Sequence, residues 1–345
     1  MRDLQLDNYR GLAMLYILCV PHVMYWLQNG GEPLLSLILM VIPVVFFISG
    51  AAMSVSNSRH GLLDTIVNRL KRIVVPFYLY ACVTLLVVTV ANWLIPGIER
   101  LGFRPFSIAE YGWKDVLSIL LCENIPGIPY MAHLWFIPLY LILSCTFPLQ
   151  AKVINRVNKH VYMAVCVVLF VLAQAFTQVS MLRELLCYNV FLVAGYLYYR
   201  KCKPRMAVGA AAVALAMLVV YVLVLGGNFC PMQDHKFPPD WVYVTYNVMT
   251  LSLWALLLWK VRIPNDRILR FWNERGFNIY LYQSFVFAIV AAIRCRTYAF
   301  TAMPVVRVLL DMVLVFGLSM GLSMLTFPLE RYVLRLFKRR PVTSS

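Results

Sequence analysis

The sequence predicts an all-α polytopic membrane protein with ten transmembrane helices. Of the 345 residues, 62% are hydrophobic and only 13% are charged, and the mean hydropathy is +0.75. A soluble domain carries about 25% charged residues and about 45–50% apolar ones. The apolar content excludes a disordered chain, and the length excludes a small secreted module held together by disulfides.

The lengths of the apolar runs predict where the spans lie. A bilayer core of about 30 Å requires roughly 20 apolar residues per helix. This criterion predicts spans at about residues 9–28, 34–55, 73–95, 134–150, 161–179, 185–200, 206–225, 241–260, 277–293 and 305–327. The first run has no small-residue cleavage site and is not expected to be a signal peptide. We therefore expect a single membrane domain over residues 1–345.

The charges predict the orientation. With ten crossings and a cytoplasmic N-terminus, most of the 31 Lys and Arg residues fall in inner segments, as the positive-inside rule requires. The net charge of +16 is thereby accounted for without a nucleic-acid partner. Both termini are expected in the cytoplasm. The amphipathic stretch Trp113–Leu121, in an outer loop, is expected to lie on the membrane surface.

Ionisable side chains within spans are costly and are therefore candidates for function. Arg10 lies where the first predicted span enters the membrane, and His22 follows twelve residues later, directly after Pro21. On a continuous helix the two would be roughly 18 Å apart along the axis, a distance comparable to a pantetheine arm. The structural alternative is that Arg10 reaches lipid head groups and His22 binds a neighbouring carbonyl.

Two further segments carry candidate residues. Arg69 and Arg72 are three residues apart, so on a helix they share a face and can bind a phosphate through forked hydrogen bonds. The alternative is that they only anchor the loop to the cytoplasmic side. At the start of the fourth span, Trp135 is interpreted as an interfacial anchor, and His133 as a solvated loop residue or a component of the site.

Other polar or small residues have simpler interpretations. The small residues that end Phe46–Gly50 allow close helix packing. Arg307 and Asp311 are expected to form an ion pair within the last helix. Cys122, Cys230 and Cys295 lie near outer segments, and whether any two pair is left open. The other cysteines are mostly within apolar runs, where they pack as small hydrophobic residues.

Together these segments resemble the acyltransferase-3 family of bacterial integral membrane acyltransferases. The motifs that carry the resemblance are L-D-x-x-R-G-x-A around Arg10 with the downstream His22, the segment Phe46–Gly50, R-x-x-R-I-x-x-P from Arg69 to Pro76, and H-L-W-F from His133 to Phe136. Weaker matches are Asn278–Tyr282 and Phe237–Pro239. The likeness covers most of the chain.

The resemblance implies transfer of an acyl group, commonly acetyl, from cytoplasmic acyl-CoA to a hydroxyl outside the membrane. The enzyme would be an acyltransferase of groups other than aminoacyl groups, O-acetyltransferase-like, in a bacterial inner or plasma membrane. The partners implied are the acyl-CoA donor, which is a substrate rather than a permanently bound cofactor, and a glycan or glycolipid acceptor. No metal is expected, because the histidines lack metal-ligand spacing.

The resemblance also assigns roles to residues. His22 matches the family's catalytic histidine and Arg10 its paired arginine, while Arg69 and Arg72 match the pair that engages the CoA phosphates. An imidazole with a pKa near neutrality suits a general base, and it can also accept the acyl group itself; both routes stay open. Glu32 and Glu123 are candidates to orient the imidazole, and His133 and Trp135 are candidates for the acceptor side.

This chain departs from the family at the spacing between Arg10 and His22, which has eleven intervening residues where the family has ten. At about 100° per residue, the extra residue moves the two side chains from nearly the same face to about 120° apart. A kink or π-bulge at Pro21 is expected to absorb it. Gln283 also stands where many members have a histidine, and Asn278 replaces the usual serine.

Two other functions remain as alternatives. A secondary transporter would also contain about ten helices with buried polar residues, but carriers often show internal repeats, and none is found in this sequence. The second alternative is a membrane sensor or scaffold that keeps the acyltransferase shape without activity, as the altered spacing between Arg10 and His22 would allow.

Overall fold

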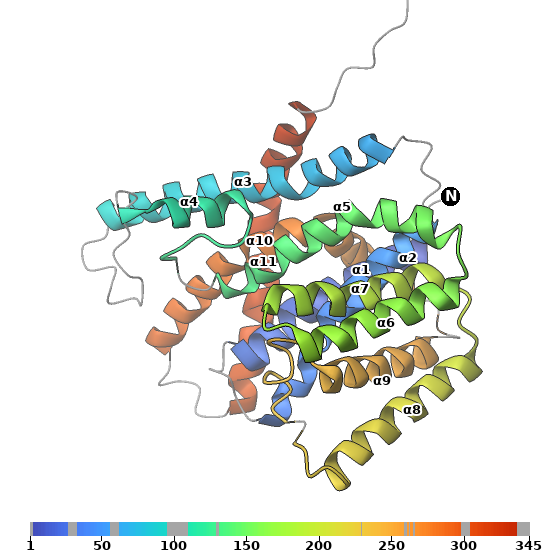
Figure 1. The fold of residues 1–345 in the computed structure, drawn as a ribbon. Coiled ribbons are helices and arrows are strands. Elements are labelled where there is room, and N and C mark those ends of the chain that lie inside the picture. The colour runs from blue at the N-terminus through green and yellow to red at the C-terminus, as the bar shows by residue number, and fades with distance from the viewer. Residues whose placement is uncertain are drawn as a thin grey trace, which may run out of the picture. The chain divides into compact units, whose positions relative to one another are not determined.

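The computed structural model describes residues 3–26, 33–55, 62–94, 110–128, 131–228, 230–258, 261, 263–264, 266–297 and 304–336. Within these ranges the protein is helical and contains no strand beyond a single bridge between Lys236 and Pro239. The longer helices are α1 (Leu4–Cys19), α2 (Val41–Val55), α3 (Leu62–Leu94), α4 (Trp113–Leu120), α5 (Phe136–Ile154), α6 (Lys159–Phe176), α7 (Ser180–Tyr198), α8 (Pro204–Leu223), α9 (Trp241–Leu258), α10 (Arg267–Thr297) and α11 (Pro304–Leu336) (Figure 1). Short π or 3-10 turns are η1 (His22–Trp26), η2 (Pro33–Leu39) and η5 (Ala132–Trp135).

The helices form two compact units that alternate along the chain. Unit 1 comprises Met1–Arg59 and Leu149–Gly276, and unit 2 comprises His60–Pro148 and Phe277–Ser345. In unit 1, α2 packs along α7 and α8 packs along α9. In unit 2, α3 packs on α11. Because each unit contains two separate stretches of sequence, neither is a contiguous domain, and the single membrane domain over residues 1–345 stays a prediction.

Eight helical segments of the described chain are long and apolar enough to cross a membrane. They correspond to eight of the ten predicted spans, and α1 and α7 correspond to the other two without meeting the same criterion. The all-helical class is therefore confirmed, while the number of ten spans and the cytoplasmic termini stay predictions.

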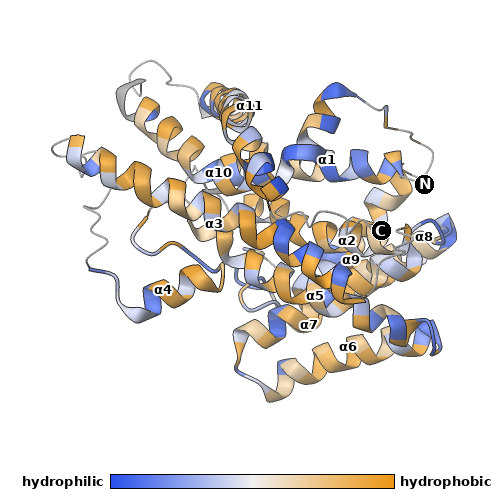
Figure 2. Cartoon of the chain, turned by 90° about the horizontal axis from the view of Figure 1, so that it is seen from above, coloured by the Kyte–Doolittle hydropathy of each residue, from blue (hydrophilic) through white to orange (hydrophobic). Residues whose placement is uncertain are grey.

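Helix α6 is coloured as hydrophobic along most of its length in Figure 2, and the sequence of α8 is equally rich in apolar residues. Eight residues of each helix are large, hydrophobic and more than 40% exposed: Val161, Val165, Val167, Val168, Leu169, Val171, Leu172 and Phe176 of α6, and Met206, Val208, Val213, Leu215, Met217, Val219, Val220 and Leu223 of α8. A soluble monomer rarely exposes an apolar patch larger than a few hundred Å². These helices therefore indicate a multi-pass membrane protein.

Three helices extend well beyond the spans predicted for them. α3 begins at Leu62 instead of about 73, α10 begins at Arg267 instead of about 277, and α11 ends at Leu336 instead of about 327. The criterion of 20 apolar residues measures only the hydrocarbon core, whereas leucine, arginine and glutamate continue a helix into water. The segment before residue 73, predicted as a loop, is therefore the first three turns of α3.

The small residues predicted to allow close packing do so in unit 1. A Cβ added to Gly50 of α2 would overlap the carbonyl oxygen of Leu192 on α7. A Cβ added to Gly195 of α7 would overlap the carbonyl oxygen of Phe47. Beside this crossing, the rings of Phe46 and Tyr188 stack with their centroids 4.9 Å apart. The packing role predicted for Phe46–Gly50 is confirmed.

Candidate functional site

The start of α1 is fixed by polar contacts inside unit 1. Asp3 caps the helix, its Oδ1 accepting hydrogen bonds from the backbone amides of Gln5 and Leu6. Its other oxygen, Oδ2, accepts from the Tyr199 hydroxyl at 2.8 Å and lies 2.7 Å from the Arg200 guanidinium. An acidic N-cap stabilises the first turn of a helix. The start of α1 is thus tied to the residues that follow α7.

Arg10 lies on the second turn of α1 and forms an ion pair within that helix. Its guanidinium is 3.7 Å from Asp7, three residues earlier, and its side chain is 42% exposed. The next residue, Gly11, touches the first turn of α10, where a Cβ would overlap the carbonyl oxygen of Leu269. Gly276 likewise approaches Met14. The side of α1 that bears these residues therefore approaches the N-terminal turns of α10.

Those turns of α10 carry three cations that the sequence interpretation did not select. Arg267 and Arg270 are exposed, and the Arg275 guanidinium lies 4.5 Å from the centre of the Phe271 ring. The amino end of a helix also favours anions through its free amide groups. In the sequence these arginines contribute only to the number of basic residues in an inner segment. Their position beside α1 depends on the contact between Gly11 and Leu269, which the sequence does not show.

His22 lies at the expected interruption of the first helix. The α-helical pattern ends at Cys19, Val20 forms a turn, and residues His22–Trp26 form a π-turn. A π-turn takes about one residue more than an α-turn, because its hydrogen bonds join residues five apart. The helix is thus interrupted next to Pro21, with the π-turn itself beginning one residue later, and the alignment of His22 with Arg10 stays a prediction. The His22 side chain is half-buried.

Arg69 and Arg72 lie in unit 2, within α3. The helix continues through both residues and through Pro76, so the three-residue spacing places the two guanidiniums on one face. Arg69 is half-buried and Arg72 is exposed. The structure thus keeps this pair together, and places it in a different unit from Arg10 and His22.

His133 is buried, which corrects its interpretation as a solvated loop residue. It lies in η5, is 9% exposed, and its ring meets that of Tyr280 edge-on at 5.0 Å. The Tyr280 hydroxyl donates a hydrogen bond to the His133 carbonyl oxygen. Trp135 ends η5 and is half-buried. The physical reason is that the turn packs under α10, so a residue predicted at the membrane surface is covered by an aromatic ring.

The buried polar contacts of unit 2 continue beyond His133. The Tyr80 hydroxyl of α3 lies 2.6 Å from Ser284 Oγ of α10, with both side chains buried. Residues of α3, of η5 and of α10 therefore share one buried core of unit 2. Tyr80 and Ser284 were not selected from sequence, because no spacing signal joins residues 204 positions apart.

Asn278, the residue that replaces the usual serine, is held by a carboxylate and a hydroxyl. Its amide nitrogen donates to Glu330 Oε2 at 2.8 Å, and its amide oxygen accepts from Thr326 Oγ1 at 3.0 Å. Both partners lie on α11. A buried polar group that is fully hydrogen-bonded stabilises one packing arrangement, so this contact fixes α10 against α11. Several turns away on the same pair of helices, Asp311 lies 3.7 Å from Arg294; the Arg307–Asp311 pair stays a prediction.

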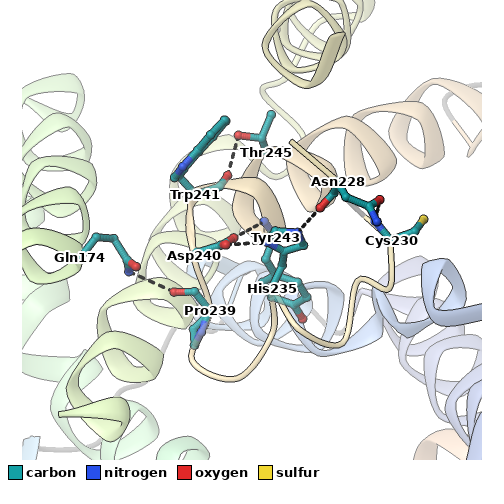
Figure 3. Close-up of polar contacts among 9 residues, drawn as sticks. All are labelled: Gln174, Asn228, Cys230, His235, Pro239, Asp240, Trp241, Tyr243 and Thr245. Carbon is teal, nitrogen blue, oxygen red and sulfur yellow. Dashed lines mark hydrogen bonds and ion pairs between the residues drawn. The ribbon is translucent and has the colours of Figure 1, made fainter. Parts of the chain in front are cut away.

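The loop before α9 contains a histidine–aspartate pair that the sequence interpretation did not identify (Figure 3). His235 Nδ1 is 2.6 Å from Asp240 Oδ2, and His235 Nε2 is 2.8 Å from the Asn228 carbonyl oxygen. Burial lowers the pKa of His235, but the hydrogen bonds to Asp240 and Asn228 and the nearby carboxylates raise it more, so that the pKa lies above its ordinary value. Because both ring nitrogens face acceptors, the charged imidazolium satisfies both and ties the two ends of the loop together. The pair is therefore a structural contact.

Lys236, next to this pair, is also buried. It is 5% exposed, and its ammonium lies 4.8 Å from the centre of the Phe237 ring. Burial lowers the pKa of Lys236 to about 8, and the Glu184 carboxylate partly opposes this effect. The loop between α8 and α9 is thus held by buried charges, which accounts for the ordered Phe237–Pro239 segment noted in the sequence.

The remaining residues singled out from the sequence are exposed, free or outside the described residues, or lie in the short helix α4. Glu123 is exposed after α4 and accepts a hydrogen bond from Ser118 Oγ at 3.4 Å. Glu32 and the side chain of Cys295 lie outside the described residues. Cys122 and Cys230 are both free thiols. The predicted stretch Trp113–Leu121 is helical as α4, and Tyr78 of α3 donates to the Leu120 carbonyl at 2.7 Å.

Comparison with known proteins identifies the family. No curated protein and no solved structure matches the chain. A family model described as an acyltransferase domain, Acyl_transf_3, matches residues 3–326 and so covers α1 to most of α11. That match spans the interrupted first helix, the arginine pair on α3 and the buried His133, so the chain belongs to the acyltransferase-3 family and is a membrane acyltransferase.

Proposed function

We propose that this protein transfers an acyl group, in the first instance acetyl, from cytoplasmic acyl-CoA to a hydroxyl of a cell-envelope or exported glycan. The observation that carries the proposal is the π-turn that begins at His22, on the same run of helix as Arg10. π-turns within α-helices are rare and occur frequently at functional sites. Membership of the family establishes acyl transfer. The identities of the donor, the acyl group and the acceptor are what we propose in addition.

The interruption next to Pro21 is proposed to restore the pairing of Arg10 with His22 despite the extra residue. On an uninterrupted helix the twelve steps between them would leave about 120° between the side chains. The break in the α-helical pattern at Val20 lies between the two residues, and a local change of about 100° there would bring them back toward one face. Arg10 would then face the donor on the cytoplasmic side while His22 meets the acceptor deeper in the membrane.

The reaction that His22 would assist breaks one C–S bond and forms one C–O bond. The acceptor hydroxyl oxygen attacks the thioester carbon, the C–S bond breaks, a C–O bond forms, and CoA leaves as the thiol. The imidazole takes the proton of the hydroxyl and returns it to the CoA sulfur. In the alternative route the imidazole nitrogen first takes the acyl group and releases CoA, and then passes the acyl group to the acceptor oxygen. Both routes give one acylated glycan and one CoA.

The donor phosphates would be held by guanidiniums. Arg69 and Arg72 on one face of α3 suit a pyrophosphate, because two planar forks can bind its oxygens at once. Arg10 is the third residue that the family resemblance assigns to the donor. With the N-terminus in the cytoplasm, all of these residues lie at cytoplasmic helix ends, in agreement with the positive-inside rule.

The test is acyl transfer by protein reconstituted in vesicles with labelled acetyl-CoA outside one membrane face and candidate glycans at the other. We expect label in the glycan with wild-type protein and none with His22→Gln. The matched control is His160→Gln, an exposed histidine in the first turn of α6, which should transfer at the wild-type rate. Solute flux without consumption of acetyl-CoA would instead favour a transporter. Neither flux nor transfer, with any of the acceptors, would favour the scaffold.

A further inference from the structure

Unit 1 contains a partly open cavity of about 430 Å³ lined by α1, α2, α7 and α9. Along α1 its lining extends from Gln5 through Tyr9 to Tyr16, positions that share one face of the helix. Eleven residues of helix rise about 16 Å, so the cavity is long and narrow. Small-molecule sites have volumes of about 300–1,000 Å³, and the cavity falls in that range.

The cavity is separate from the proposed catalytic residues. Neither Arg10 nor His22 lines it. Arg10 lies about 100° around the helix axis from Tyr9, the centre of the lining face. On that other side α1 meets α10, through the contacts of Gly11 and Met14. The cavity and the contact with α10 therefore lie on different faces of α1. The ligand of the cavity has to be inferred separately from the reaction at His22.

The chemistry of the wall selects an alkyl chain. Leu12, Val44 and Leu251 are typical of its middle part. The hydroxyl of Tyr16 already donates to the Ile38 carbonyl at 3.1 Å, and that of Tyr199 donates to Asp3. An amide placed between such walls would lose its hydrogen bonds to water without replacement. The pantetheine arm of CoA contains amides, so an unbroken hydrocarbon chain fits this cavity better.

One end of the cavity carries positive charge. Arg200 and Gln5 line that end, where α7 finishes and α1 begins. Arg200 is held 2.7 Å from Asp3, which balances one charge. Exposed lysines and an arginine follow directly: Lys201, Lys203 and Arg205. Basic pockets between helices on the cytoplasmic side of a membrane bind anionic lipid head groups.

We propose that the cavity holds one acyl chain of an anionic phospholipid of the cytoplasmic leaflet, with its head group on the basic segment Arg200–Arg205. The apolar walls of α1, α2, α7 and α9 exclude water from the chain, and the basic segment selects the head group. The site is independent of His22 chemistry and uses the predicted orientation only to name the leaflet.

Lipid retention tests this directly. The full-length protein is delipidated in detergent and incubated with an equimolar mixture of palmitoyl-oleoyl phosphatidylglycerol and palmitoyl-oleoyl phosphatidylcholine, and bound lipids are counted by native mass spectrometry. We expect one retained phosphatidylglycerol, preferred over phosphatidylcholine by about tenfold, or about 1.4 kcal/mol. Equal retention of the two lipids would overturn the charge-selected site.

Filling the cavity provides the structural arm of the test. Ala255 lines the cavity from α9 and is exposed, so Ala255→Trp fills space without displacing a packed side chain. We expect it to reduce lipid retention by about tenfold, with a smaller loss for Ala255→Leu. Ala212→Trp is the matched control, because Ala212 is an exposed alanine on α8 that does not line the cavity. Equal retention by Ala255→Trp and Ala212→Trp would overturn the proposal.

Two further arms separate the head group from the donor. Lys201→Gln combined with Lys203→Gln should abolish the preference for phosphatidylglycerol, whereas Lys159→Gln, an exposed lysine at the start of α6, should keep it. Free CoA in excess should leave the bound lipid in place. If CoA displaces the lipid, the cavity belongs to the path of the acyl donor and the lipid site is wrong. Loss of transfer by His22→Gln with lipid retained would leave this inference intact.

Discussion

Proline has different effects on the first helix of unit 1 and the long helices of unit 2. α1 ends two residues before Pro21 and is followed by a π-turn, whereas α3 runs for 33 residues through Pro76 and α11 for 33 residues through Pro328. Proline lacks the amide hydrogen and crowds the carbonyl four residues earlier. Each of the three prolines therefore leaves one backbone carbonyl without its helical hydrogen bond, but only at Pro21 is the helix interrupted.

The position of the freed carbonyl explains the difference. Before Pro76 and Pro328 it belongs to Arg72 and Met324, which are exposed residues near the ends of the predicted spans. Before Pro21 it belongs to Ile17, which is 3% exposed in the middle of a span. Water or lipid head groups can satisfy a carbonyl at a span end, while a deep one requires the chain itself to rearrange. The interruption at His22 therefore follows from depth as well as from proline.

The prediction with the largest expected effect tests whether the interruption at His22 is needed for acyl transfer. His22→Gln should lower the rate of acyl transfer by about 10²–10⁴-fold, the usual contribution of a positioned acid–base group. Donor binding should change little, because the imidazole is proposed to meet the acceptor. The measurements are labelled acyl transfer in vesicles and CoA binding by calorimetry. His22→Gln with wild-type transfer would separate the π-turn from catalysis.

The second prediction straightens the first helix. Pro21→Ala restores an amide hydrogen, which lets α1 continue toward His22 and turns the ring away from the Arg10 face. Misplacement of a reacting group by about 1 Å can cost about 10²-fold in rate, and we expect a loss of that size. Pro148→Ala, in the unbroken helix α5, is the control and should leave transfer unchanged. Equal losses in both variants would mean that proline acts only on folding.

The third prediction asks whether α2 and α7 of unit 1 cross as closely as their glycines indicate. Gly50→Ala places a methyl group into the backbone of α7, and overpacking of this kind costs about 1–3 kcal/mol. Gly209→Ala is the matched control, since a Cβ at Gly209 meets nothing within 4 Å. The free energy of unfolding in detergent should fall only for Gly50→Ala. Similar values for both variants would contradict the close crossing of α2 and α7.

Most of the fold follows from the sequence, because lipid imposes a simple rule. Each predicted span corresponds to a helix, since a backbone in hydrocarbon must satisfy its own hydrogen bonds. The rule ends at the membrane surface, so the additional turns of α3 and α11 were not predicted. The π-turn was predictable from the combination of Pro21 with one extra residue before His22.

The polar contacts of the site were harder to predict. Asn278 and Glu330 are 52 positions apart and are joined only by the packing of α10 on α11. His235 and Asp240 are five residues apart, but in a loop, where no periodicity indicates which side chains meet. His133 was interpreted as a solvated loop residue or a component of the site because it precedes a span, and the structure covers it with Tyr280. Helix periodicity identifies faces, but it does not identify partners.

The fourth prediction concerns the continuous helix α3. Arg72→Ala should weaken CoA binding by about tenfold, within the range expected for hydrogen bonds to a charged group. Lys71→Ala, one residue earlier and on a different face, should bind CoA as the wild type does. Titration calorimetry with CoA measures both. If the two variants lose affinity equally, general positive charge rather than the face shared by Arg69 and Arg72 binds the donor.

The smallest expected effect concerns the loop before α9, and it depends on pH. The pKa of His235 in the folded protein lies above its usual 6.5, through Asp240 and the Asn228 carbonyl acting against burial. The stabilisation is therefore complete below pH 6.5 and is lost as the pH rises through the raised pKa. Hydrogen exchange of residues 226–240 should accelerate across that window beyond its ordinary pH dependence, by an amount equivalent to about 1 kcal/mol. His235→Gln should remove the extra acceleration, whereas His160→Gln should keep it; parallel profiles for His235→Gln and wild type would show that the loop is held by Lys236 and its other packing contacts instead.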